Sequence, residues 1–210
     1  MVQLPAFGVQ RIAEERPRIA VNRNRYVLYP GTQAIPATAA PRILNRPFTI
    51  TAEVELPEGA EGVLLSMGGN DGGISFYVQD AKLCYVHNYV AVKHYYVKSA
   101  AALPVGHHFL SMEFEPTGKP EIAKGKGAPG IVKLLVDGQE IGRGDLPITS
   151  PLRLGQGAAM LVGADTGAPV TPEYRPPFRF TGTIKRVIVD ISGEHVEDYE
   201  AEMRLVLARQ

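Results

Sequence analysis

The stretch FTITAEVEL, residues 48–56, decides the fold class. Its apolar and polar residues alternate strictly, and a period of two is typical of a β-strand with one buried and one solvated face. Pro57, Glu58 and Gly59 follow directly and turn the chain. We therefore expect a strand over residues 48–56 in a sheet that covers an apolar core.

Outward from this stretch, 22 glycines and 17 prolines separate short apolar runs along the chain. Short strands at regular spacing with turn residues between them are typical of a β-sandwich. Besides 48–56, we expect strands over residues 25–29, 63–67, 74–79, 82–88, 92–98, 108–114, 131–136, 139–142, 150–153, 158–162 and 178–191. The sequence therefore predicts an all-β sandwich of two antiparallel sheets.

A tight hairpin is predicted where Asp80 and Ala81 connect two apolar runs. In that register Phe76 lies opposite Tyr85, and this face of the hairpin belongs to the core. The other face is more apolar than a freely solvated sheet surface, so we expect something to cover it. Its residues are Ser75, Tyr77, Cys84, Val86 and Asn88.

The two ends of the chain differ in composition from the middle. Residues 1–24 have no periodicity, and we interpret them as a linker or wrapping arm. Residues 25–192 form the predicted sandwich domain. Residues 193–210 are predicted to form a short C-terminal helix, because apolar residues recur there at helical spacing. These residues are Val196, Tyr199, Met203, Leu205 and Val206.

Charge and hydropathy limit the kinds of partner. The chain has 22 basic and 22 acidic residues and a formal net charge of zero, so it lacks the positive field that binds nucleic acid or an anionic membrane. Residues Met1 to Gln10 carry no signal-peptide pattern, and no stretch is apolar enough to span a bilayer. We expect neither nucleic acid nor membrane as a partner, and a cytoplasmic location.

The sequence contains no pattern typical of a catalytic or metal-binding site. There is no nucleophile elbow, and Cys84 and His87 are three apart on one expected strand, so they point to opposite faces. Glu53 and Glu55 share a strand face without a third acid in register. We expect no catalytic residue, no metal ligands and no cofactor.

Calcium is the one cofactor that the sequence leaves open. Asp71, Asp145 and Asp165 lie in glycine-rich turns, where carboxylates and carbonyl groups can converge on an ion. Turn chemistry alone explains Asp beside Gly, and we prefer that interpretation.

A cluster of tyrosines is the only candidate binding surface. Flat aromatic rings with a few polar groups can stack on sugars, and the same rings can pack against another domain. Both alternatives, a glycan ligand and a partner domain, use the same face, and we give the partner domain more weight. The candidate binding or docking residues are Tyr77, Val86, Asn88, His94, Tyr95 and Tyr96.

A series of motifs runs in order through the predicted sandwich. They are YPGT at 29–32, APRILNR at 40–46, ITAEVELP at 50–57, EGVLL at 61–65, GGISFYV at 72–78, LCYVHN at 83–88, LVDG at 135–138, VGADTGAPV at 162–170 and PFRFTGTI at 177–184. This order resembles the C-terminal region that follows the catalytic domain of bacterial arylsulfatases. Ala81 and Ala91 depart from that pattern, because the family has Gly at these turn positions.

The resemblance implies a concanavalin-like, laminin-G-like jelly roll that packs against a sulfatase catalytic domain in the same or a companion chain. It also implies that this chain is not itself an enzyme, since the C/S-x-P-x-R motif of sulfatases is missing from it. The alternative function is a stand-alone carbohydrate-binding, lectin-like module.

Overall fold

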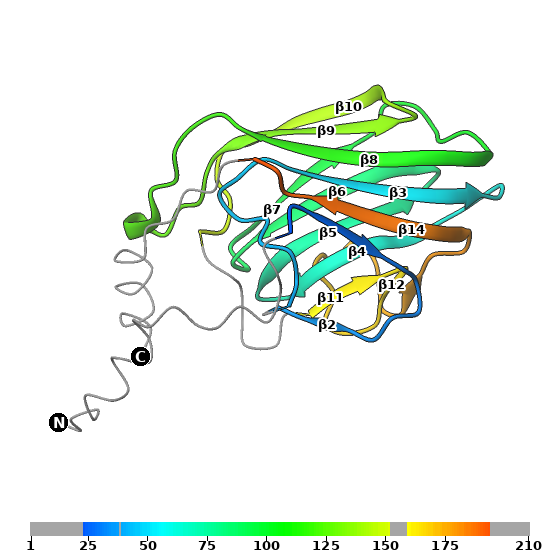
Figure 1. Ribbon diagram of the computed structural model, residues 1–210, viewed down its shortest axis with the longest axis horizontal. Helices are drawn as coiled ribbons and strands as arrows, with labels where there is room; N and C mark the ends of the chain where they lie inside the picture. The colour runs from blue at the N-terminus through cyan, green and yellow to red at the C-terminus, as the bar shows by residue number, and fades with distance from the viewer. Residues whose placement is uncertain (1–22, 38, 152–158, 194–210) are drawn as a thin grey trace.

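The computed structural model describes residues 23–37, 39–151 and 159–193. In these ranges the chain forms two β-sheets packed face to face, with sheet A in front of sheet B in the view of Figure 1. The predicted all-β sandwich is confirmed. The predicted arm at 1–24, except for its last two residues, and the predicted helix at 193–210, except for Gly193, lie outside the described residues.

Sheet A is antiparallel throughout and contains the strand with which the sequence argument began. Its order is β1 (Arg25–Leu28), β14 (Thr183–Asp190), β3 (Phe48–Leu56), β8 (Gly106–Pro116), β9 (Gly130–Val136) and β10 (Gln139–Leu146). The apolar residues of β3 are buried and pack on the core, as the alternation predicted. The edge strand predicted at 25–29 is confirmed as β1.

Sheet B is built around four consecutive antiparallel strands joined by three hairpins. Its order is β12 (Ala164–Asp165), β13 (Phe178–Arg179), β4 (Gly62–Gly69), β5 (Gly72–Gln79), β6 (Lys82–Tyr89) and β7 (Lys93–Lys98). A further strand, β11 (Ala159–Val162), pairs with β4 and with the short β2 (Ile35–Pro36). All pairings are antiparallel except Arg179 beside Val63. Outside the strands, residues Ile122–Lys124 form one turn of 3-10 helix.

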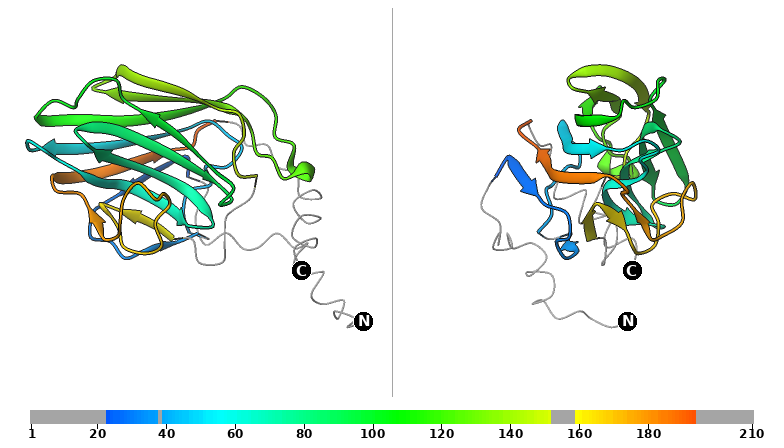
Figure 2. Two further views of the ribbon diagram at one scale, coloured as in Figure 1. Left: turned by 180° about the vertical axis from the view of Figure 1, so that it is seen from behind. Right: turned by 90° about the vertical axis from the view of Figure 1, so that its right-hand side faces the viewer.

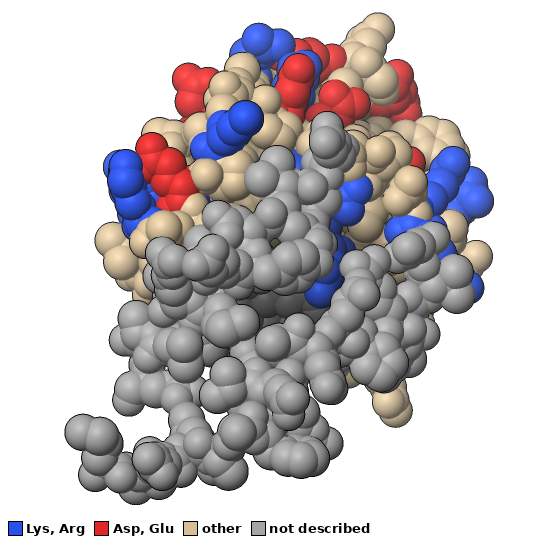
Figure 3. Space-filling model, turned by 60° about the vertical axis from the view of Figure 1, so that its left-hand side comes forward, with Lys and Arg blue, Asp and Glu red and all other residues tan. Residues whose placement is uncertain are grey.

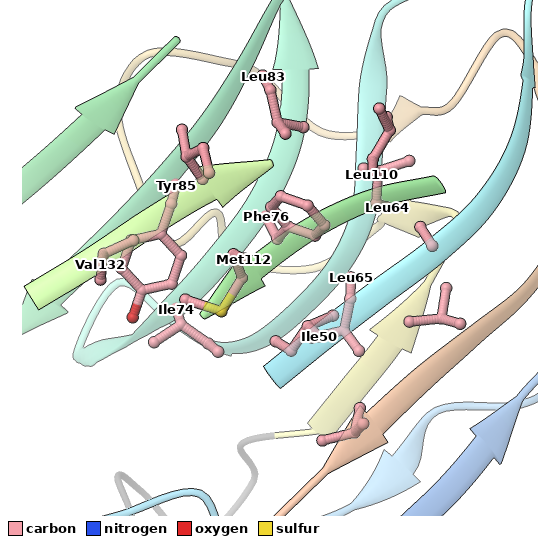
Figure 4. Packing of buried hydrophobic residues seen from close by; sticks show 14 of the residues in the cluster. Ile50, Leu64, Leu65, Ile74, Phe76, Leu83, Tyr85, Leu110, Met112 and Val132 are labelled. Carbon is pink, nitrogen blue, oxygen red and sulfur yellow. The ribbon is translucent and has the colours of Figure 1, made fainter. Parts of the chain in front are cut away.

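The main core fills the space between the two sheets. Figure 4 shows side chains from both sheets pointing into this space, among them Phe76 and Tyr85 of sheet B and Met112 of sheet A. Phe76 lies opposite Tyr85, as predicted for the tight hairpin. Its turn residues Asp80 and Ala81 have φ angles of 52° and 57°. These angles fit the two-residue turn that the sequence indicated.

The single long strand predicted over 178–191 is wrong, because the chain changes sheets within it. Residues 178–179 belong to sheet B as β13, and 183–190 belong to sheet A as β14. Between them the Phe180 amide donates to Gly163 O at 3.0 Å, and the Thr181 amide donates to Glu61 O at 2.8 Å. These two bonds fix residues 180–182, where the chain crosses from sheet B to sheet A and belongs to the strand pairing of neither sheet. Gly62 permits the close approach of β13, since a Cβ there would lie 2.2 Å from Arg179 O.

The strand predicted over 150–153 is not formed by Ser150 and Pro151, the two of its residues that are described. Ser150 instead donates its backbone amide to Nε2 of His87 on sheet B, at 3.0 Å. None of the described residues forms a helix long and apolar enough to cross a bilayer. Lys, Arg, Asp and Glu lie intermixed on the described surface in Figure 3.

Candidate functional site

Sheet B carries a second apolar core on its outer face. Residues 166–177, which we call the covering segment, connect β12 to β13 and lie on this face (left view of Figure 2). The ring of Tyr174 packs edge-on against Tyr77 at 5.3 Å and stacks on Phe178 at 4.8 Å. The cluster comprises Val63, Tyr77, Cys84, Val86, Val170, Tyr174 and Phe178.

Buried hydrogen bonds fasten the covering segment to the sheet. The Tyr174 hydroxyl lies 2.8 Å from Oδ2 of Asp165 and 2.9 Å from Oγ of Ser75, and all three residues are buried. Tyr174 therefore gives the buried Asp165 carboxylate a donor, which a carboxylate needs when it leaves water.

A second set of bonds joins the covering segment to β5 and β7. Tyr77 Oη donates to Oε2 of Glu173 at 2.6 Å, and Lys98 Nζ donates to Oε1 of the same residue at 2.8 Å. Burial, together with the hydrogen bond to Glu173, raises the pKa of Tyr77 far above its ordinary value. Glu173 thus connects β5 and β7, the strands on either side of β6, through one carboxylate.

Asn88 holds two loops at one end of this face. Its Nδ2 lies 3.0–3.1 Å from the carbonyl oxygens of Gly69, Asn70 and Val170, and its Oδ1 accepts the Ala91 amide at 3.0 Å. Because every polar atom of this amide group is engaged and the residue is fully buried, Asn88 has a structural role.

The structure therefore places half of the predicted site residues out of reach. Tyr77, Val86 and Asn88 are 0% exposed beneath the covering segment. They offer no surface to a ligand or to a partner domain. The expectation that something covers this face is confirmed, and the cover is the chain itself.

His94 and Tyr96 remain accessible at the edge of sheet B, on β7. Their rings stack with centroids 6.1 Å apart, and Tyr96 is 37% exposed. The ammonium group of Lys98 lies 5.6 Å from the Tyr96 ring centroid, within the range of a cation–π contact. We call His94, Tyr96 and Lys98, with the adjacent Thr171 and Glu173, the β7 strip.

Polar contacts fix the rings of the β7 strip. Tyr96 Oη lies 2.8 Å from Oγ1 of Thr171, and His94 Nε2 lies 3.2 Å from Val170 O. Tyr95, the other predicted residue of β7, packs against the main core, with Lys93 Nζ 4.9 Å from its ring centroid. The prediction of a site on β7 therefore narrows to His94 and Tyr96, joined by Lys98, which the sequence argument did not include.

Sheet A has a different outer face, which no described segment covers with an apolar cluster. The carboxylate of Glu53 accepts a bond from Arg186 Nε at 2.8 Å and lies 3.2 Å from His107 Nε2 and 3.6 Å from Lys185 Nζ. Burial raises the Glu53 pKa, but the bond from His107 and the neighbouring cations outweigh it and lower the pKa. Exposed Phe109 and Val27 lie on the same face.

Sequence reasoning missed the partners of Glu53 because they come from strands far along the chain. The strand register identifies these partners, because β3 pairs with β8 on one side and with β14 on the other.

Cys84 and His87 point to opposite faces of sheet B, as predicted. Cys84 belongs to the outer cluster, where burial raises the pKa of its thiol to about 11, and His87 lines the space between the sheets. Such a thiol is protonated at neutral pH and is a poor nucleophile.

The calcium alternative finds no support in the described residues. No three His, Cys, Asp or Glu side chains among residues 23–37, 39–151 and 159–193 are grouped as a metal site. Asp71 is exposed in the turn between β4 and β5, Asp145 is exposed on β10, and Asp165 is buried against Tyr174. The three carboxylates thus belong to separate surroundings.

No family model matches this chain, and no curated protein matches its sequence. Solved structures share the fold. The IT-sialidase CBM40 of Ruminococcus gnavus is 17% identical over 88% of this chain and 96% of that chain, with a TM-score of 0.52. A leech intramolecular trans-sialidase in complex with 2,7-anhydro-Neu5Ac is 16% identical over 86% of this chain, with a TM-score of 0.53.

This chain spans only 27% of the leech enzyme. A heptameric SAP-like pentraxin from Limulus polyphemus is 13% identical over 80% of this chain and 77% of that chain, with a TM-score of 0.45. At these identities the similarity concerns the fold alone: the chain is a concanavalin-like β-sandwich.

Proposed function

We propose that this chain is a non-catalytic carbohydrate-binding module whose ligand site is the β7 strip. The observation that carries the proposal is the pair of parallel, accessible rings of His94 and Tyr96 beside polar groups. Aromatic faces bind the C–H surfaces of sugars, while nearby carboxylate, hydroxyl and ammonium groups fix the sugar hydroxyls. Glu173 supplies the carboxylate, Lys98 the ammonium group and the exposed Tyr96 the hydroxyl.

The proposed ligand is an acidic glycan, and a sialylated sugar is the first to test. Lys98 places its ammonium group beside the exposed Tyr96 ring, where it can meet a carboxylate. The CBM40 module of Ruminococcus gnavus, which has a similar fold, has been solved bound to α2,3-sialyllactose. Identity of 16% transfers the fold only, so the ligand is a proposal for this chain.

Titration of the protein with α2,3-sialyllactose, α2,6-sialyllactose, a sulfated lactose and neutral lactose tests the proposal. We expect the acidic sugars to bind. Tyr96→Ala should lower their affinity about 3- to 10-fold, the range for loss of one aromatic contact. Tyr29→Ala is the matched control, because Tyr29 is 55% exposed and lies outside the strip. Equal loss in both variants, or no binding of any of the four sugars, would overturn the proposal.

A second candidate function is the accessory domain of an arylsulfatase-type sulfatase. Its support is the ordered series of motifs between residues 29 and 184, which resembles the C-terminal region of that family. The docking surface would be the outer face of sheet A, where Phe109 and Val27 are 39% and 44% exposed. Isolated apolar side chains within a polar face are common in interfaces between domains.

Mixing this chain with a sulfatase catalytic fragment tests the second candidate. We expect a complex by analytical ultracentrifugation, weakened by Phe109→Ser and unchanged by Tyr96→Ala. Absence of any complex with a folded catalytic fragment would remove this candidate. The two variants thus separate docking through sheet A from glycan binding at β7.

A further inference from the structure

A small cavity lies between the sheets at the end where β3 begins and β6 ends. Its volume is about 50 Å³, and its apolar walls include Phe48, Met67, Ile74 and Phe114. The exposed Arg42 also borders it, which marks the side facing the surface. None of these residues belongs to the β7 strip.

Two residues of β6 also line this cavity, and each has one polar atom, Tyr85 Oη and His87 Nδ1, without a hydrogen-bond partner among the described residues. Tyr85 is 1% exposed, and within the described part of the chain nothing hydrogen-bonds its hydroxyl. Burial alone accounts for the raised pKa of Tyr85. Figure 4 shows its ring among the core side chains of both sheets. The hydroxyl opens on the cavity, so an occupant there can pair it.

His87 supplies the second group, two residues along the same strand and on the same face. Its Nε2 accepts the Ser150 amide at 3.0 Å, so the proton of the neutral imidazole is on Nδ1. Burial lowers the pKa of His87 to about 4, and the ring is therefore neutral at pH 7. Among the described residues Nδ1 has no acceptor, which leaves it for an occupant of the cavity.

The side chains of Asn45, Thr149 and Ser150, which also border the cavity, are hydrogen-bonded within the protein, and the exposed Arg42 is engaged as well. Asn45 donates from Nδ2 to Pro151 O at 3.0 Å and accepts the Ala128 amide at Oδ1, also at 3.0 Å. Thr149 donates its hydroxyl to Ala128 O at 2.8 Å. The cavity therefore presents one N–H donor and one hydroxyl against apolar walls, the usual composition of a small-molecule site.

We propose that this cavity binds a small neutral amide or carbonyl group, such as the acetamido group of a larger ligand. A carbonyl oxygen accepts from His87 Nδ1, an amide N–H donates to Tyr85 Oη, and a methyl group packs on the apolar wall. Since one water needs about 10–15 Å³ of such space, the cavity accommodates about four heavy atoms, as in an acetamido group. A neutral group is favoured over an ion because dehydration of a charge in an apolar cavity is costly.

The experiment is a titration of the whole chain with N-methylacetamide, followed by NMR of the His87 imidazole nitrogens and the Ile74 and Met67 methyl groups. We expect saturable shifts with a dissociation constant of about 1–50 mM, as for a ligand of about five heavy atoms. Acetate and tetramethylammonium are the charged comparison probes. Absence of saturable shifts at these nuclei, or tighter binding of acetate than of the amide, would overturn the proposal.

Two conservative variants separate binding from folding. Tyr85→Phe removes only the unpaired hydroxyl, so the unfolding midpoint should stay unchanged or rise. The affinity for N-methylacetamide should fall at least about 3-fold. Tyr77→Phe, in the second core, should leave the amide affinity unchanged. Leu44→Phe narrows the cavity from the half-buried side and should also abolish the shifts. Unaltered affinity in both Tyr85→Phe and Leu44→Phe would place the probe elsewhere and end the proposal.

Discussion

The outer faces of the two sheets differ in what lies on them. On sheet B, Tyr77 and Val86 are fully buried under the covering segment and form a second apolar core with Tyr174. On sheet A, the corresponding face carries the Glu53 ion-pair network, and Phe109 and Val27 are 39% and 44% exposed. The covering segment therefore adds a third layer outside sheet B, whereas no described segment adds a layer outside sheet A.

The contrast bears on what an apolar sheet face in a sequence indicates. Such a face indicates that a cover exists, because exposed apolar area of this extent is unfavourable in water. It does not indicate where the cover comes from. Here Tyr174 reaches Ser75 across 99 positions of the sequence, and such long loops cost little more entropy than shorter ones.

The largest expected effect comes from uncovering sheet B. Tyr174→Ala removes a buried ring that contacts Tyr77 and Phe178 and leaves the buried carboxylate of Asp165 without its hydroxyl partner. We expect the free energy of unfolding to fall by about 3–5 kcal/mol. Urea denaturation followed by tyrosine fluorescence and circular dichroism measures it.

Phe109→Ala on sheet A is the matched comparison. Phe109 is partly exposed and contacts the His107 ring at 5.5 Å, so its loss should cost less than about 1 kcal/mol. Similar losses in both variants would contradict the distinction between a covered and an uncovered face.

The second largest effect is a pH dependence from His87 of sheet B. The folded-state pKa is lowered to about 4 by burial, below the ordinary value of 6.5, so the unfolded chain binds the proton first. Stability is therefore fully present above pH 6.5 and is lost as the pH falls towards 4. The expected loss is about 3 kcal/mol. Unfolding curves of the protein and of His87→Gln between pH 7 and pH 4 should diverge by that amount.

His108 on sheet A should titrate with the opposite sign. Its hydrogen bond to Asp137, at 2.7 Å, raises the pKa of the imidazole above its ordinary value of 6.5. This stabilisation is fully present below pH 6.5 and is lost as the pH rises through the folded-state pKa. His108→Gln should therefore destabilise the protein more at pH 5.5 than at pH 8, whereas the reverse order would show that the ion pair is not formed.

An intermediate effect is expected from Asn88, which holds the end of the covering segment. Asn88→Ala removes the amide that joins Val170 to the turn at Gly69 and Asn70. Several buried carbonyl groups lose a donor, and we expect a cost of about 2 kcal/mol. Faster hydrogen exchange should be confined to residues 69–71, 89–92 and 168–171. If hydrogen exchange became faster throughout both sheets, Asn88 would stabilise the whole sandwich and not only this face.

The strands were predictable where alternation and turns were both strong. Residues 48–56 alternate without interruption, and the structure has β3 with these bounds. The hairpin at Asp80 and Ala81 was predictable with its register, because a two-residue turn leaves only one pairing. The crossing at 180–182 was not predictable, because its apolar alternation continues through the point where the chain leaves sheet B for sheet A.

The candidate site was only partly predictable for a related reason. Alternation assigned Tyr77, Val86, Asn88, His94 and Tyr96 to one face, and they do share it. Local pattern cannot tell which part of that face a distant segment covers, so three of these residues proved to be buried. Lys98 belongs to the same face by its spacing from Tyr96, and that signal was present in the sequence.

The smallest expected effect compares one turn from each sheet. The β9–β10 hairpin of sheet A has Asp137 and Gly138 at its turn, with φ of 51° and 80°, and the β5–β6 hairpin of sheet B has Asp80 and Ala81 at 52° and 57°. A left-handed backbone costs an L-residue about 1–2 kcal/mol, of which the extra chain entropy of glycine offsets part. Ala81→Gly should therefore raise the free energy of unfolding by about 0.5–1 kcal/mol, and Gly138→Ala should lower it by a similar amount. A lower thermal unfolding midpoint for Ala81→Gly than for the unchanged protein would contradict backbone strain at the sheet B turn. The packing of the Ala81 side chain would then decide the stability of this turn.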